Sequence, residues 1–122
     1  MTKRTPLPIQ HAVQAIVDKK GENFIVLDVR DVCTMTDYFI IAEGHVPRHV
    51  SAIGDYVAER LQKEGLVPLH REGETQGEWV VLDYMSFVVH IFTPELRDYY
   101  ALEELWKEGK IVSVPVNYGK EE

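Results

Sequence analysis

Thr36-Asp37-Tyr38-Phe39-Ile40-Ile41-Ala42-Glu43-Gly44 is the most informative segment for predicting how this chain folds. Its centre, Tyr38 to Ala42, is a continuous apolar run, and an earlier run, Phe24-Ile25-Val26-Leu27, closes on Asp28. Short apolar runs of this kind are typical of strands buried on both faces. The segment from Arg30 to Asp37 is too short to hold a crossover helix, so we expect the two strands to pair antiparallel as a hairpin with a long loop.

Two helical segments flank this hairpin in the sequence. The first opens at Pro8 and ends at Lys19-Lys20-Gly21, and the second begins at Pro47 and ends at Gly65. Val46 is a poor N-cap for the second helix because its side chain has no acceptor, so we expect His45 or water to serve the free N–H groups. The apolar residues at helical spacing are Ile9, Ala12, Val13, Ile16 and Val17 in the first helix, and Val50, Ile53, Val57 and Leu61 in the second.

The second half of the chain predicts another hairpin. Its strands are Trp79 to Leu82 and Phe87 to Phe92, joined by a turn over Asp83 to Ser86. A short edge strand is expected over Leu66 to Leu69, because Pro68 cannot donate to a sheet ladder. The loop from His70 to Glu78 then leads into the hairpin.

The chain ends in a helix and a tail. Thr93 is expected to cap the helix and Pro94 to open it, with an end at about Lys107 and a break near Tyr100. The tail alternates briefly from Ile111 to Val114, but Pro115 makes it a poor strand, so residues 109–122 receive no assignment. Residues 1–6 are expected to be a loose leader, residues 7–107 one domain, and residues 108–122 a flexible tail.

The order of elements indicates an α/β (α+β) domain with one mixed sheet of about five strands and helices packed against it. The length of 122 residues suits a single core. A net charge of −7 disfavours a protein that binds nucleic acid by neutralising phosphates and suits a basic protein partner. Cys33 is the single cysteine, and the apolar runs are far shorter than a membrane helix, so we expect a cytoplasmic protein.

No pattern in the sequence predicts an active site. Asp28, Asp37 and Asp83 lie at strand ends, where acids can hold a metal, but they lack the close pairing and the glycine-rich loop that phosphate chemistry requires. Turns, caps or partner contacts are the favoured roles for these acids. The five histidines show no zinc-ligand spacing, and Cys33 has no recognisable catalytic partner. We therefore expect no catalytic residue, metal or cofactor.

Trp79 is the strongest candidate for a binding residue. It follows a glycine-bearing polar loop and begins a strand, where a large ring is either half exposed as a binding hot spot or folded over the end of the core. Tyr84 and Met85, in the adjacent turn, would add exposed apolar area if they point outward. The final helix carries more apolar residues than one docking stripe needs, so its aromatic residues either seal the sheet or meet a partner or a second copy.

Taken in order, these segments resemble the ribosomal silencing factor family, also called RsfS or Iojap-like. The resemblance covers roughly residues 7–107. The matching positions are Thr36, Asp37, Ile40, Ile41, Gly44, Arg48, His49, Val50, Asp55, Glu72, Gly73, Trp79, Asp83, His90, Arg97, Tyr100, Leu102, Glu103, Leu105 and Trp106. It implies a fold similar to that of nucleotidyltransferases, without their catalytic signature.

The resemblance also implies a function. Members of the family bind the large ribosomal subunit through large-subunit protein fourteen, block joining of the small subunit, and lower translation when nutrients are scarce. On this basis we expect the partner surface to comprise Glu72, Gly73, Trp79, Asp83, Tyr84 and Met85, of which Tyr84 and Met85 depart from the family motif. Little direct contact with nucleic acid is expected.

Three alternatives stay open. Three of the matching positions, Asp37, Arg48 and His49, have two possible roles. They either contact the partner or form an internal polar network that ties the second helix to the first hairpin. The protein either silences the large subunit or assists its assembly without silencing it. A metal-dependent nucleotidyltransferase-like enzyme is the third reading, and a homodimer is compatible with all of them.

Overall fold

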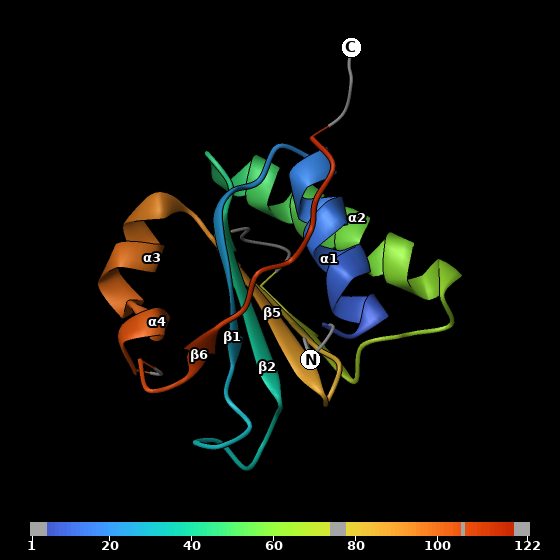
Figure 1. Ribbon diagram of the computed structural model, residues 1–122. Coiled ribbons are helices and arrows are strands. Elements are labelled where there is room, and N and C mark those ends of the chain that lie inside the picture. Colours follow the sequence, from blue (N-terminus) through green and yellow to red (C-terminus); the bar gives the residue numbers. More distant parts are fainter. Residues whose placement is uncertain (1–4, 74–77, 106, 119–122) are drawn as a thin grey trace.

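A computed structural model describes residues 5–73, 78–105 and 107–118, and these residues form a single α+β domain around a mixed sheet (Figure 1). The strands are β1 (Glu22–Asp28), β2 (Tyr38–Glu43), β3 (His70–Glu72), β4 (Trp79–Asp83), β5 (Phe87–Phe92) and β6 (Lys110–Ile111). The helices are α1 (Leu7–Asp18), α2 (Pro47–Lys63), α3 (Pro94–Tyr100) and α4 (Leu102–Leu105). The strands lie in the order β3-β4-β5-β2-β1-β6.

Both predicted hairpins are confirmed. β1 pairs antiparallel with β2, and β4 pairs antiparallel with β5. The two hairpins join through β2 and β5, which run parallel from Tyr38↔Phe87 to Glu43↔Phe92. Because β2 is central in the sheet and covered on both faces, every residue from Tyr38 to Ala42 is buried, which explains why the sequence there is continuously apolar.

Helices α1 and α2 cover one face of the sheet, and α3 with α4 lie on the other (Figure 1). The predicted apolar residues of α1 and α2 enter the main core together with the inward side chains of the strands, except that Val17 is only partly buried. Gly54 allows α2 to lie close to β4, since a Cβ atom there would come within 2.9 Å of the Val80 Cγ1 atom. Beyond α2, Gly65 has the positive φ of a helix stop, as expected.

The edge strand begins later than the sequence suggests. Leu66–Leu69 form no strand, and the edge strand β3 starts at His70, inside the segment expected to be a loop. Pro68 has no N–H to donate, so the chain joins the sheet only at Leu69, whose N–H donates to the carbonyl oxygen of Asp83 at 2.7 Å.

The tail also departs from expectation. Lys110–Ile111 pair with β1 as β6, and the Val112 N–H continues the ladder to the Val26 carbonyl. Val112, Val114 and Val116 then pack against the main core, and Gln14 of α1 exchanges two hydrogen bonds with the backbone of Asn117. The sequence missed this strand because its partners lie about eighty residues away and Pro115 follows four residues after Ile111.

The final helix breaks where the sequence predicts. Ala101, with a φ of 45°, ends α3 after Tyr100, and α4 follows at once. Thr93 occupies the N-cap position, but its side chain makes no capping hydrogen bond, so that part of the prediction is wrong. Its backbone N–H instead donates to the Glu78 carbonyl and anchors the start of α3 beside β4.

Candidate functional site

The candidate site is the sheet face that α1 and α2 leave uncovered. Paired residues of antiparallel neighbours share a face, so the register Glu72↔Val81↔His90 and Asp83↔Val88 places these side chains together with Trp79. We call Glu72, Trp79, Val81, Asp83, Val88 and His90 the open sheet face. Beside it, on the same face of the sheet, lies a second apolar cluster formed by Leu27, Val29, Phe39, Ile41 and Phe92.

Trp79 lies at the centre of an aromatic group on this face. Its ring stacks on that of Phe92, with ring centroids 5.0 Å apart. It also contacts the ring of Tyr100 in α3, with ring centroids 4.6 Å apart. The indole Nε1–H donates to the Nδ1 atom of His90 at 3.1 Å. Trp79 is half-buried, so the ring both covers the end of the second cluster and keeps exposed area.

His90 is the polar residue beneath this aromatic group. Its side chain is 8% exposed, and burial lowers the pKa of the imidazole to about 4, against an opposing pull from the nearby Asp83 carboxylate. The ring is therefore neutral at neutral pH. His90 is thus a nearly buried histidine whose side chain is hydrogen-bonded at the edge of the core.

The loop residues predicted beside Trp79 are found there. Gly73 has a φ of +86°, and a Cβ atom at this position would lie 1.8 Å from the Trp79 carbonyl oxygen, so only glycine lets the chain pass. Glu72 is exposed on the adjacent edge strand. Gly77, which the sequence also placed in this loop, lies outside the described residues.

Asp83 and Met85 form the turn at the end of β4. The Asp83 carboxylate accepts a hydrogen bond from the Met85 N–H at 2.8 Å, which stabilises the positive φ of 73° at Met85. Met85 is 64% exposed, as the sequence suggested.

Tyr84 does not point outward. It is 8% exposed, belongs to the main core under α1 and α2, and stacks on Phe87 with centroids 4.9 Å apart. Burial raises the pKa of its phenol to about 12, and its hydroxyl has no hydrogen-bond partner among the described residues. Tyr84 therefore adds no exposed apolar area, because the strand alternation at the end of β4 turns it to the opposite face.

Asp37, Arg48 and His49, for which an internal polar network was one of two alternatives, are not brought together. His49 Nδ1 accepts from the His45 N–H at 2.9 Å and its Nε2 bonds to the Lys19 carbonyl at 2.7 Å, which ties the start of α2 to the end of α1. Asp37 precedes the opposite end of β2, and neither it nor Arg48 makes a side-chain hydrogen bond or ion pair within the described part of the chain. His49 thus links the segment before α2 to the end of α1, and no side chain caps the N-terminus of α2 among the described residues.

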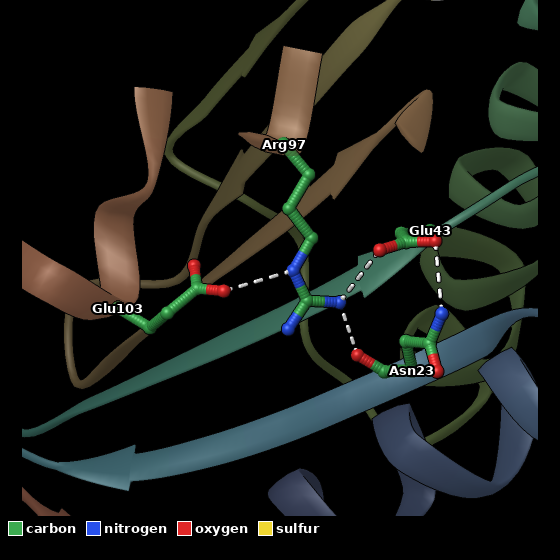
Figure 2. A network of polar contacts seen from close by, with 4 residues as sticks. All are labelled: Asn23, Glu43, Arg97 and Glu103. Atoms are coloured by element: carbon green, nitrogen blue, oxygen red, sulfur yellow. Dashed lines mark hydrogen bonds and ion pairs between the residues drawn. The ribbon is translucent and has the colours of Figure 1, made fainter. Parts of the chain in front are cut away.

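Arg97 holds a network that the sequence did not predict (Figure 2). The side chain is 9% exposed and its guanidinium donates to the Asn23 carbonyl, to Glu43 at 3.3 Å and to Glu103 at 3.2 Å. The Asn23 amide in turn donates to Glu43 at 3.0 Å. An arginine in a short helix suggests an exposed residue, and only its presence among the family-matching positions marked it out.

The carboxylates weighed as a metal site are separated by the sheet. Asp28 ends β1 and Asp83 ends β4, and the intervening β2 and β5 keep them about 14 Å apart at the usual strand spacing. Asp28 instead binds Arg30 at 2.6 Å, and that hydrogen bond lowers the pKa of its carboxyl. Within the described ranges, no three histidine, cysteine or acidic side chains gather closely enough to hold a metal ion. Among the described helices none combines the length and apolarity that a bilayer crossing demands.

The fold and the open sheet face define a small α+β domain with one partly uncovered aromatic and acidic surface. The chain belongs to the family described as "Ribosomal silencing factor during starvation", which it matches over residues 2–121. The match extends beyond residues 7–107 at both ends and takes in the tail.

Individual relatives agree with this assignment. The chain is 34% identical to the ribosomal silencing factor RsfS of Halalkalibacterium halodurans over 87% of its length and 91% of that protein. A crystal structure of a Chromobacterium violaceum protein superimposes with a TM-score of 0.82 at 33% identity, covering 97% of this chain and 98% of that one. A mouse protein named "Mitochondrial assembly of ribosomal large subunit protein 1" is 32% identical over 80% of this chain and 44% of its own length.

Proposed function

We propose that this protein binds the large ribosomal subunit through large-subunit protein fourteen and sterically blocks joining of the small subunit, which represses translation when nutrients are limiting. Membership of the ribosomal silencing factor family supports the general role. The half-buried Trp79 on the open sheet face is the observation that carries the proposed contact, because a partly exposed aromatic anchored on a rigid sheet is typical of a binding hot spot.

The charge of this surface favours a basic protein partner. Glu72 and Asp83 flank the aromatic centre, and the whole chain carries a net charge of −7. Acidic groups around an apolar centre steer a basic partner and leave the desolvated ring to supply most of the affinity. The proposed contact residues are Glu72, Gly73, Trp79, Asp83 and Met85, while the buried Tyr84 supports the turn from below.

Co-sedimentation with isolated ribosomal subunits tests the proposal. We expect the protein to sediment with the large subunit and not with the small one, and Trp79→Ala to weaken binding at least tenfold. Tyr118→Ala is the matched control, since Tyr118 is 76% exposed and lies beside α1, away from the open sheet face. Melting curves establish that both variants are folded. Failure of the wild-type protein to bind the large subunit would contradict the proposal.

Joining of the subunits is the second step to measure. In a light-scattering assay of small and large subunits, we expect added protein to reduce joining in proportion to its occupancy of the large subunit. Binding without inhibition would favour the alternative that the mouse relative's name suggests, a factor that assists assembly of the large subunit. Subunit profiles of depleted cells would then show a shortage of mature large subunits. Sedimentation of the isolated protein would show whether it forms a homodimer.

A further inference from the structure

The hydrogen bonds at the centre of the open sheet face leave one donor unused. A tryptophan side chain has a single N–H, and Trp79 gives it to His90 Nδ1 at 3.1 Å. A neutral imidazole has one donor nitrogen and one acceptor nitrogen, so acceptance at Nδ1 places the ring hydrogen on Nε2. The indole of Trp79 therefore has no N–H left to donate to a partner. The polar group that remains beside it is the Nε2–H of His90.

This donor has no hydrogen-bond partner among the residues that the structure describes. No hydrogen bond joins His90 Nε2 to any part of the described chain. The atom is also not one of the fully buried polar atoms, so it remains accessible from outside. The ring lies among aromatic neighbours, with centroid distances of 5.5 Å to Phe39, 6.0 Å to Trp79 and 6.1 Å to Phe92. A donor set among apolar rings gains a strong hydrogen bond once a partner excludes water from it.

The surrounding charges determine which acceptor fits. Asp83 is near enough to act on the His90 ring electrostatically, and Glu72 lies on the same face. A partner carboxylate or phosphate placed on Nε2 would be repelled by these acids, whereas a neutral carbonyl oxygen would not. A backbone carbonyl oxygen in a basic segment fits this site, because the oxygen itself is neutral and the segment around it is attracted by Asp83 and Glu72.

We propose that His90 is a specificity-determining residue of this surface, which positions the Trp79 indole through Nδ1 and donates its Nε2–H to a backbone carbonyl oxygen of the large-subunit partner. This inference rests on the proposed function. Its geometric half, the tautomer and the indole hydrogen bond, concerns the free protein alone.

Two substitutions separate the two nitrogen atoms. In His90→Asn the amide oxygen takes the place of Nδ1 and accepts from Trp79, but no donor remains at the position of Nε2. In His90→Phe both functions are lost while a ring is retained. The measurements are co-sedimentation with isolated large subunits, a melting curve, and ¹H–¹⁵N spectra that report the histidine tautomer and the hydrogen exchange of the indole N–H. The Trp79 indole signal is the one that Trp79→Ala removes.

We expect the Nε2–H tautomer in the free wild-type protein and slow exchange of the Trp79 indole N–H. His90→Asn should keep that slow exchange and bind the large subunit about tenfold more weakly, the loss expected for one hydrogen bond. His90→Phe should lose both the slow exchange and at least as much affinity. Tyr118→Ala should match the wild type in every measurement.

The outcomes that overturn the inference differ from those that overturn the proposed function. If the wild type binds the large subunit and both His90 variants bind it as tightly as the wild type does, His90 does not determine specificity, although the silencing function stands. An Nδ1–H tautomer would overturn the inference even if His90→Asn failed to fold. If the wild type binds no large subunit, the proposed function fails and the partner contact fails with it.

Discussion

At the scale of single residues, His90 makes the stability of the protein depend on pH. Its pKa is about 4 in the folded protein, against 6.5 for an unperturbed histidine. Above pH 6.5 neither state binds the proton. Between pH 6.5 and 4 the unfolded chain takes up a proton that the folded chain refuses, so the free energy of unfolding falls, by about 3 kcal/mol in total.

Urea unfolding of the wild type and of His90→Phe across this pH range checks the prediction. The variant should lose the part of the pH dependence that His90 causes, so the difference between the two curves should shrink as the pH is lowered. His70→Gln is the control, because His70 is exposed on the edge strand. Parallel curves for His90→Phe and the wild type would mean that the buried ring does take up a proton.

Gly73 gives a second test at this scale. Gly73→Ala should destabilise the protein by about 2 kcal/mol or more, because it combines a positive φ with a Cβ atom 1.8 Å from the Trp79 carbonyl oxygen. Gly65→Ala is the matched control, since Gly65 has the same φ of +86° but nothing within 4 Å of its Cβ position. That variant should cost about 1 kcal/mol. Equal losses in chemical denaturation would show that the close approach at Gly73 is relieved without cost.

At the scale of elements, Arg97 fixes α3 and α4 over the sheet. Arg97→Met should lower the free energy of unfolding by about 3 kcal/mol, because Glu43 and Glu103 lose the cation that compensates them. Arg97→Lys should lose less, since an ammonium group keeps the charge but cannot reproduce the fork of contacts. Arg48→Met, at an exposed arginine without an ion pair in the described chain, should leave stability unchanged.

Hydrogen exchange shows where the Arg97 effect acts. Amides of α3 should exchange faster in Arg97→Met, while those of α1 and α2 should change only as much as the global stability does. Tyr100 would then be held less firmly against Trp79, with which it is in contact at 4.6 Å. Uniform loss of protection throughout the chain would mean that Arg97 stabilises the whole domain rather than this one layer.

The elements also show what a sequence can predict. The hairpins β1–β2 and β4–β5 were predictable because their strands are neighbours in the chain and their apolar runs are bounded by polar turns. β6 and the Arg97 network were not, because each depends on contacts between segments 54 or more residues apart. Trp79 was found from its place after a polar loop, but its hydrogen bond to His90 follows only from the register of β4 against β5.

At the scale of the whole molecule, charge and aromatic contact should act on different steps of binding. The net charge of −7 attracts a basic partner at long range, which raises the association rate and weakens with salt. The contacts of Trp79 form only after docking, so they should govern dissociation. We therefore expect the association rate with the large subunit to fall at least about tenfold between about 0.01 M and about 0.15 M salt.

Stopped-flow binding to large subunits separates the two steps. Glu72→Gln should lower the association rate and flatten its salt dependence, because Glu72 lies on the open sheet face. Glu59→Gln makes the same change of charge on the exposed side of α2 and should have a smaller effect on the association rate. Trp79→Ala should raise the dissociation rate and leave the salt dependence intact. If Glu59→Gln slowed association as much as Glu72→Gln does, the attraction would come from total charge alone, and the acids around Trp79 would not determine which face of the domain meets the ribosome.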